Sequence, residues 1–155
     1  MRIPLAALIG LFFTGLYFFG AIFAAWISPY GMAEVVGDSW EPWSAAHWLG
    51  TDTIGRDLLS RMIWGGQTTI FVATASTLLS FSLGSSLGFF AAVKGGWVDQ
   101  LLSRLVDLMM SIPSLISALV VLSVMPVTLP VLIVVMGVLD STRVFRLSRA
   151  VAVDI

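Results

Sequence analysis

The stretch QTTIFVATASTLLSFSLGSSLGFFAAV, residues 67–93, carries no charged side chain. The hydrocarbon core of a bilayer is about 30 Å thick, so roughly 20 apolar helical residues are needed to cross it. Helix is the expected structure because unpaired backbone groups are costly in lipid. The stretch therefore predicts a membrane-spanning helix. Small residues recur on it at four-residue spacing, which favours close docking of another helix; they are Ser80, Gly84 and Gly88. The groove so formed serves either helix packing alone or also one wall of a solute path.

Three further spans are predicted on either side of this helix. Residues 3–27 carry no charge and are too long an apolar run for the core of a secretory signal peptide. The uncharged stretch 108–139 is too long for one helix, and Pro126 and Pro130 near its middle predict a tight hairpin. Its helices would cover about 101–125 and 129–146. The predicted fold class is an all-α, polytopic bundle of about four spans, kinked in the third span at Pro113, where a gating role is a hypothesis.

Composition agrees with a membrane protein and excludes other classes. Of the 155 residues, 58% are hydrophobic and only 11% charged, against about 25% charged in soluble domains, and the mean hydropathy is +0.99. A net charge of -1 offers no basic face for nucleic acid. The only histidine, His47, lacks partners for a metal, so we expect a surface or interfacial histidine, no metal site and no cofactor. No P-loop and no Ser-His-Asp arrangement is recognisable, so no catalytic residue is predicted.

Basic residues predict which side of the membrane each loop faces. With four crossings, one side holds six basic residues and the other holds two; these are Arg2, Lys94, Arg104, Arg143, Arg146 and Arg149 against Arg56 and Arg61. The positive-inside rule then places the amino terminus in the cytoplasm and residues 28–66 outside. Tryptophans near the span ends are expected to lie in the headgroup zone.

The segment HWLGTDTIGRDLLSR, residues 47–61, predicts a turn that leads into a helix, and we call it the signature segment. Gly50 and Gly55 permit backbone angles that other residues avoid. Thr51 and Asp52 are residue types of turns and caps. The helix that follows has one apolar side, so we expect it to lie along the membrane surface before turning inward; that side consists of Leu58, Leu59, Met62 and Ile63.

Three pairs of opposite charges have helical spacing. Asp57 and Arg61 stand at i,i+4, where they would face each other and steady the bundle on its outer side. Two further pairs stand three residues apart near predicted span ends, where they would pair at the interface; they are Arg104 with Asp107 and Asp140 with Arg143.

Ordered motifs over residues 47–149 resemble the C-type permease subunit of the dipeptide, oligopeptide and nickel class of ABC importers. In chain order they are LGTD (49–52), GRD (55–57), SR (60–61), GGWVD (95–99), RLVD (104–107) and IPSL (112–115). Several motifs in the right order are far more specific than any one of them. The positions singled out as family or structural sites are Gly50, Thr51, Asp52, Gly55, Arg56, Asp57, Arg61, Asp107 and Pro113.

The resemblance implies a six-helix, non-catalytic permease of the bacterial inner membrane. Its expected partners are a homologous second permease, two cytoplasmic ATPase subunits, an extracytoplasmic solute-binding protein and the lipid bilayer. Residues 1–66 would form the first span with its periplasmic loop and interfacial helix, and residues 67–155 an incomplete permease core. The sequence stops before the family's Glu-Ala-Ala coupling loop, so the alternative is a truncated, non-transporting protein with a structural or regulatory packing role. No residue is singled out as a solute ligand.

Overall fold

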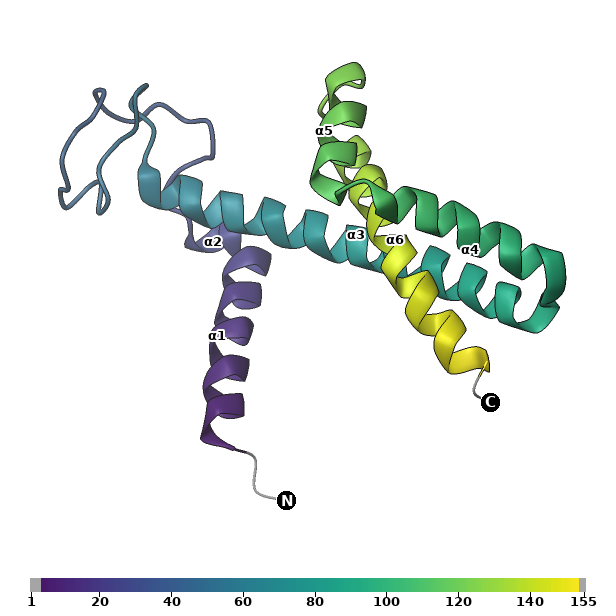
Figure 1. The fold of residues 1–155 in the computed structure, drawn as a ribbon. Coiled ribbons are helices and arrows are strands. Elements are labelled where there is room, and N and C mark those ends of the chain that lie inside the picture. Colours follow the sequence, from purple (N-terminus) through teal and green to yellow (C-terminus); the bar gives the residue numbers. More distant parts are fainter. Residues whose placement is uncertain (1–3, 154–155) are drawn as a thin grey trace. The chain divides into compact units, whose positions relative to one another are not determined.

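The computed structural model describes residues 4–153, and within them the chain is helical apart from one long loop and short connections (Figure 1). Two compact units divide at residues 71 and 72. Arg2 and Ile3, which enter the charge argument and the first predicted span, lie outside the described residues. The helices are α1 (Leu5–Ile22), α2 (Ala24–Ile27), α3 (Leu58–Lys94), α4 (Gly96–Ser111), α5 (Ser114–Val124) and α6 (Leu129–Val153).

The first unit contains α1, α2, the long loop of residues 28–57 and the first turns of α3. The helix α1 follows Pro4, a residue that is tolerated at a helix start because its nitrogen needs no partner there. The helical path is interrupted at Phe23, where the backbone leaves helical angles before α2 begins. Only 6% of α1 is buried in the structure although its mean hydropathy is 2.1. Its apolar surface is therefore available to lipid.

The helix α3 begins directly after the long loop and runs without interruption from Leu58 to Lys94. The prediction of a surface helix that turns before the span is therefore wrong: residues 58–63 are the first turns of the same helix as residues 67–93. Nothing in the intervening sequence breaks the helix, because Gly65 and Gly66 are the only weak helix formers there and no proline is present.

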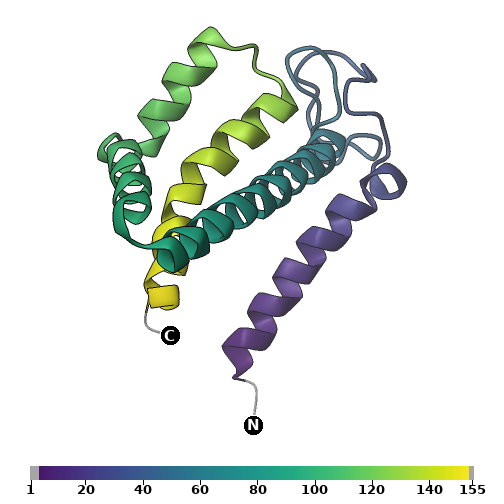
Figure 2. The ribbon, with the colours of Figure 1, turned by 90° about the vertical axis from the view of Figure 1, so that its right-hand side faces the viewer.

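Prolines set the breaks in the second unit. Ile112, which precedes Pro113, has extended angles and ends α4, and Met125, which precedes Pro126, ends α5 in the same way. The reason is steric, since the proline ring disfavours helical angles in the residue before it. At Pro113 the chain bends by 85° between α4 and α5, far more than a kink. The predicted hairpin at Pro126 is confirmed, with residues 125–128 connecting α5 to α6 (Figure 2).

The all-helical fold class is confirmed, but the helices meet the criteria for spanning unevenly. Among residues 4–153, α1 and α3 are long and apolar enough to cross a membrane, and α4 with α5 would make a third span if the bent pair counts as one. The predicted fourth span corresponds to α6. Its uncharged part ends before Asp140, after 11 residues from Leu129, which is about 16 Å of helix and half of the hydrocarbon thickness.

Candidate functional site

The signature segment folds back on residues 37–41 of the long loop. Gly50 and Gly55 have φ of 76° and 79°, which confirms that both occupy angles favourable to glycine. A side chain at either position would also collide with backbone: a Cβ on Gly50 would meet the Glu41 carbonyl oxygen, and a Cβ on Gly55 the Gly37 carbonyl oxygen. The two glycines are thus required both by their own backbone angles and by the close approach of the facing chain.

Thr51 joins the same two stretches through its side chain. Its hydroxyl donates to the Asp38 carbonyl oxygen at 2.5 Å and accepts from the Glu41 N–H at 2.8 Å. Its own N–H donates to the Glu41 carbonyl oxygen at 3.1 Å. The side chain is almost completely buried, with 2% of the residue exposed. Each of these polar groups therefore has a partner inside the loop, which an apolar residue of the same shape could not supply.

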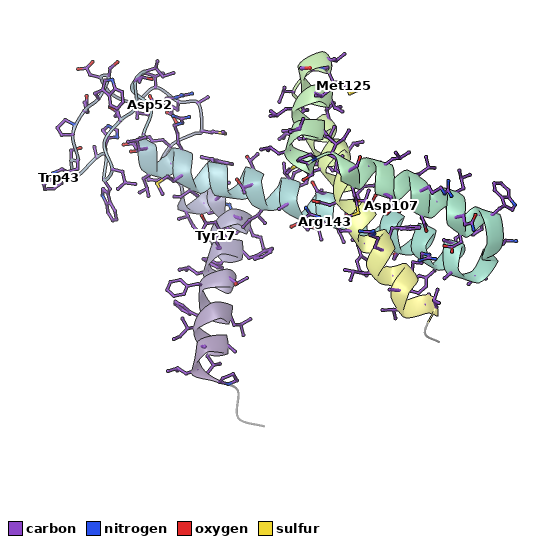
Figure 3. All side chains as sticks on the ribbon, in the orientation of Figure 1. Tyr17, Trp43, Asp52, Asp107, Met125 and Arg143 are labelled. Atoms are coloured by element: carbon purple, nitrogen blue, oxygen red, sulfur yellow. The ribbon has the colours of Figure 1, made fainter. Side chains whose placement is uncertain are left out.

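Asp52 is the centre of a buried ionic network in the signature segment (Figure 3). Its Oδ1 accepts from the N–H groups of Ile54 and Arg56 at 2.9 and 3.0 Å. Its Oδ2 accepts from Arg56 Nε at 2.8 Å and from Arg61 Nη1 at 2.6 Å. Burial disfavours the charged form of Asp52, but these hydrogen bonds and the guanidinium charge outweigh that cost and lower the pKa of the carboxyl. The predicted pairing of Arg61 with Asp57 is therefore wrong.

Asp57 instead caps the start of α3. Its Oδ2 accepts from the Ser60 N–H at 2.7 Å, the geometry of an N-cap carboxylate, and from the Ser60 hydroxyl at 2.8 Å. Its other oxygen lies 3.2 Å from His47 Nδ1. Burial opposes ionisation of Asp57, but the bonds from Ser60 and the contact with His47 lower its pKa overall. His47 is only 5% exposed, so of the two predicted alternatives, a surface or an interfacial histidine, the surface one is wrong.

In the second unit, α6 lies against the small residues of α3, and we call this contact the α3–α6 seam (Figures 1 and 2). A Cβ on Gly84 would stand 2.6 Å from the Ser141 carbonyl oxygen, and one on Gly88 2.8 Å from the Phe145 carbonyl oxygen. From the other side, a Cβ on Gly137 would stand 2.7 Å from Leu79 Cδ2. Ser80 is buried in line with these glycines. The two backbones therefore approach so closely at Gly84 and Gly88 that no larger residue fits there, whereas Gly137 makes room for the Leu79 side chain.

Ion pairs connect α4 to α6 beyond the seam. Arg149 donates to both carboxylate oxygens of Asp99, from Nε to Oδ1 and from Nη2 to Oδ2 at 2.6 Å, and Asp107 accepts from Arg146 at 3.1 Å. The predicted partner of Asp107, Arg104, is therefore wrong, although both Asp107 and Arg146 are more than half exposed. Figure 3 shows Asp107 on α4 near the α6 helix that carries Arg143.

The remaining predicted positions lie apart from these networks. Asp140 and Arg143 stand 3.9 Å apart on α6, as their spacing indicates. Pro113 lies at the bend between α4 and α5, where it lines a pocket with Met109, Leu139 and Thr142 among others. Within residues 4–153 no group of acidic residues and histidine is arranged to hold a metal ion. The Asp99–Arg149 pair escaped sequence reasoning because its members are 50 residues apart and no local spacing signals it.

A comparison with protein families matches residues 84–155 to the family described as binding-protein-dependent transport system inner membrane component. This is a family of transport components and not of enzymes. The matched residues contain the three glycines of the α3–α6 seam, all of α4, α5 and α6, and the two ion pairs that join α4 to α6.

Whole-chain comparisons extend the similarity through the signature segment. The chain is 36% identical over 151 residues to the dipeptide transport system permease protein DppC of Haemophilus influenzae, covering 93% of this chain and 51% of that protein. It is 34% identical to the di/tripeptide permease DppC of Pseudomonas aeruginosa, covering 93% and 50%. It is 30% identical to the oligopeptide permease OppC of Bacillus subtilis, covering 92% and 47%. The chain spans about half the length of these relatives.

Proposed function

Since this chain belongs to the family of binding-protein-dependent transport system inner membrane components, we propose that it forms part of the transmembrane path of an ATP-driven importer of peptides or similar small solutes. The observation that supports this most is its similarity, over more than nine-tenths of its length, to peptide permeases. The absence of a recognisable catalytic motif in the sequence agrees with ATP hydrolysis by separate subunits.

The proposed assembly contains three kinds of partner: one in the membrane, one in the cytoplasm and one outside the cell membrane. A homologous second permease completes the path, two cytoplasmic ATPase subunits drive it, and an extracytoplasmic solute-binding protein delivers the solute. The basic residues Lys94, Arg146 and Arg149 are grouped at the ends of α3 and α6, which places these ends in the cytoplasm in this proposal. Since α1 and α3 each cross the membrane once, the amino terminus then also faces the cytoplasm. The long loop of residues 28–57 then faces outward.

The second unit supplies the moving part in this proposal. The seam fixes α6 to α3, whereas α5 is joined to α4 through a break that has no helical hydrogen bonds across Pro113. Element ends of this kind can absorb the backbone rotation of a conformational change while packed helices move as rigid bodies. Pro113→Ala is expected to extend the helix and reduce transport and its coupling to ATP hydrolysis. Unchanged transport and coupling in that variant would remove the hinge from the proposal.

The experiment that tests the function is uptake of a labelled dipeptide into proteoliposomes that contain this chain with its transport-system partners. ATP and the ATPase subunits are placed on the side that corresponds to the cytoplasm, and the solute-binding protein on the other. We expect uptake that requires ATP, the binding protein and this chain. Matched vesicles contain an ATPase whose P-loop lysine is replaced and should be inactive.

The packing-only alternative makes a different prediction for purification. A permease subunit should retain the ATPase subunits when it is isolated in detergent, whereas a non-transporting packing protein should retain only a membrane partner. Isolation without ATPase, together with no uptake in the vesicles, would overturn the proposed function.

A further inference from the structure

We propose that residues 38–43, the tip of the long loop, are the surface on which a basic patch of the extracytoplasmic solute-binding protein docks. This inference rests on the proposed function, which supplies the partner and the outward direction of the loop. It adds the surface of this chain that the partner contacts and the kind of chemistry that holds it.

The first observation is the backbone of Trp40. Its φ is 59°, and it is the one residue other than glycine with positive φ among residues 4–153. A bulky side chain in this conformation is a genuine outlier. Such strain persists only where the surrounding structure enforces it, and it is found preferentially at functional sites. Trp40 is therefore a position where a tryptophan is retained at a backbone angle better suited to glycine.

The second observation is that the signature segment enforces this conformation. The Trp40 N–H donates to the Asp52 carbonyl oxygen at 3.1 Å. On either side of Trp40, the Asp38 carbonyl oxygen and the Glu41 N–H both bond the Thr51 hydroxyl. Gly50 admits the Glu41 carbonyl oxygen at a distance that any side chain would prevent. The segment by which the chain resembles its family thus acts as a clamp on the loop tip.

The third observation is what the clamp presents. Trp40 and Trp43 are 72% and 82% exposed, and Figure 3 shows Trp43 at the edge of the loop, away from the Asp52 network. Asp38, in the same tip, is also exposed. Rigid, exposed tryptophans are the side chains that most often dominate the energy of protein interfaces. The tip therefore has the composition of a preformed binding surface.

Charge selects the kind of partner. Residues 28–50 contain Glu34, Asp38 and Glu41 but no lysine or arginine. The arginines that follow in sequence, Arg56 and Arg61, are both engaged by Asp52. An acidic surface is repelled by anionic headgroups, which attract basic segments instead. A protein surface with complementary basic residues would both steer the encounter and fix its orientation. These charges favour a protein partner over the lipid surface.

The test measures binding of the solute-binding protein to the complete transporter in nanodiscs of zwitterionic lipid. The main variant combines Trp40→Gly with Trp43→Ala. Glycine at position 40 removes the side chain and fits the positive φ, so the loop fold is retained. We expect the dissociation constant to rise at least tenfold. Asp38→Lys should slow association several-fold and reduce its dependence on salt. The matched control is Trp26→Ala, which removes an equally exposed tryptophan from α2 and should leave binding unchanged.

The outcomes separate this inference from the function on which it rests. Binding by the unaltered transporter together with unchanged binding by all tip variants would overturn the docking surface and leave the proposed function standing. No binding to the unaltered transporter would overturn both. Quenching of the tip tryptophans by brominated lipid, seen as a difference between the unaltered chain and the Trp40→Gly, Trp43→Ala variant, would show that the tip lies in the membrane and would also overturn the inference.

Discussion

The long loop and the α3–α6 seam are both tightly packed, but different interactions hold them: hydrogen-bonded polar side chains in the loop and close contact between helices in the seam. The loop buries polar side chains, among them His47, Thr51, Asp52 and Asp57, and connects each to a partner. The seam is built where glycines and Ser80 let two backbones meet. Outside it the helices keep their large apolar side chains exposed, Phe81 at 63% for example. Lipid tails are as apolar as leucine and phenylalanine, so burying these side chains against another helix gains little free energy. Association of helices in the membrane therefore depends on close packing at small residues.

This contrast predicts different weaknesses in the two regions. A change of volume should be most damaging in the seam, where backbone faces backbone and cannot move aside. A change of backbone angle or of charge should be most damaging in the loop, whose order depends on glycine conformations and on a few carboxylates. Substitutions in each region therefore separate the two cases.

Gly84→Leu should separate α6 from α3. Even the first carbon of the new side chain would stand 2.6 Å from both the Ser141 carbonyl oxygen and Val144 Cβ. We expect a loss of about 3 kcal/mol in the free energy of unfolding, at the upper end for overpacked sites. The measurement is denaturant unfolding in detergent micelles.

The control for that prediction is Gly65→Leu on the same helix. A Cβ on Gly65 would have no neighbour within 4 Å, so the added side chain meets open space. It should change unfolding little. Equal damage from the substitutions at positions 65 and 84 would show that leucine in α3 is harmful for a reason unrelated to the seam.

Gly55→Ala should disorder the loop at a smaller cost. The substitution forces alanine to φ near 79° and brings its methyl group against the Gly37 carbonyl oxygen. Left-handed angles at residues other than glycine cost about 1 to 3 kcal/mol. Faster trypsin cleavage after Arg56 would report the loss. Gly31→Ala in the same loop has normal φ and only ordinary contacts at 3.5 Å or more, so it should leave cleavage unchanged.

Acid should loosen the loop before it affects the seam. Asp52 and Asp57 have pKa values below those of an unfolded chain, so their contribution to stability is complete above the ordinary aspartate pKa of about 3.9 and is lost as the pH falls through the lowered values. Near-ultraviolet circular dichroism of the loop tryptophans should therefore stay constant from pH 7 to about pH 4 and decline below that. Asp57→Asn retains the cap and should weaken the decline. A signal already lost at pH 5 would contradict this assignment.

Arg146→Gln should have the smallest effect. Its ion pair with Asp107 is 3.1 Å long, but both side chains are 58% exposed. Exposed pairs contribute about 0 to 1 kcal/mol, and salt screens them. We expect a change in unfolding free energy below about 1 kcal/mol that vanishes at high salt. Arg149→Gln should cost more, because its bidentate pair with Asp99 is less exposed.

What could be predicted from the sequence follows from how local the cause is. The positive φ of Gly50 and Gly55 and the break before Pro126 depend on one residue type each, and all three were predictable. The partners of Arg61 and Asp107 could not be predicted. Arg61 pairs with Asp52 and Asp107 pairs with Arg146, and neither partner stands at helical spacing. The burial of His47 likewise depends on the tertiary path of the loop, which no spacing reveals.

Through Asp52, the signature segment orders the long loop independently of the seam. Hydrogen exchange followed by mass spectrometry, on Asp52→Ala and the unaltered chain in nanodiscs, tests this most directly. We expect residues 37–57 to lose protection in the variant while residues 80–91 of α3 and 137–149 of α6 keep theirs. Unchanged protection in the loop, or a loss of protection in the seam of equal size, would contradict this expectation.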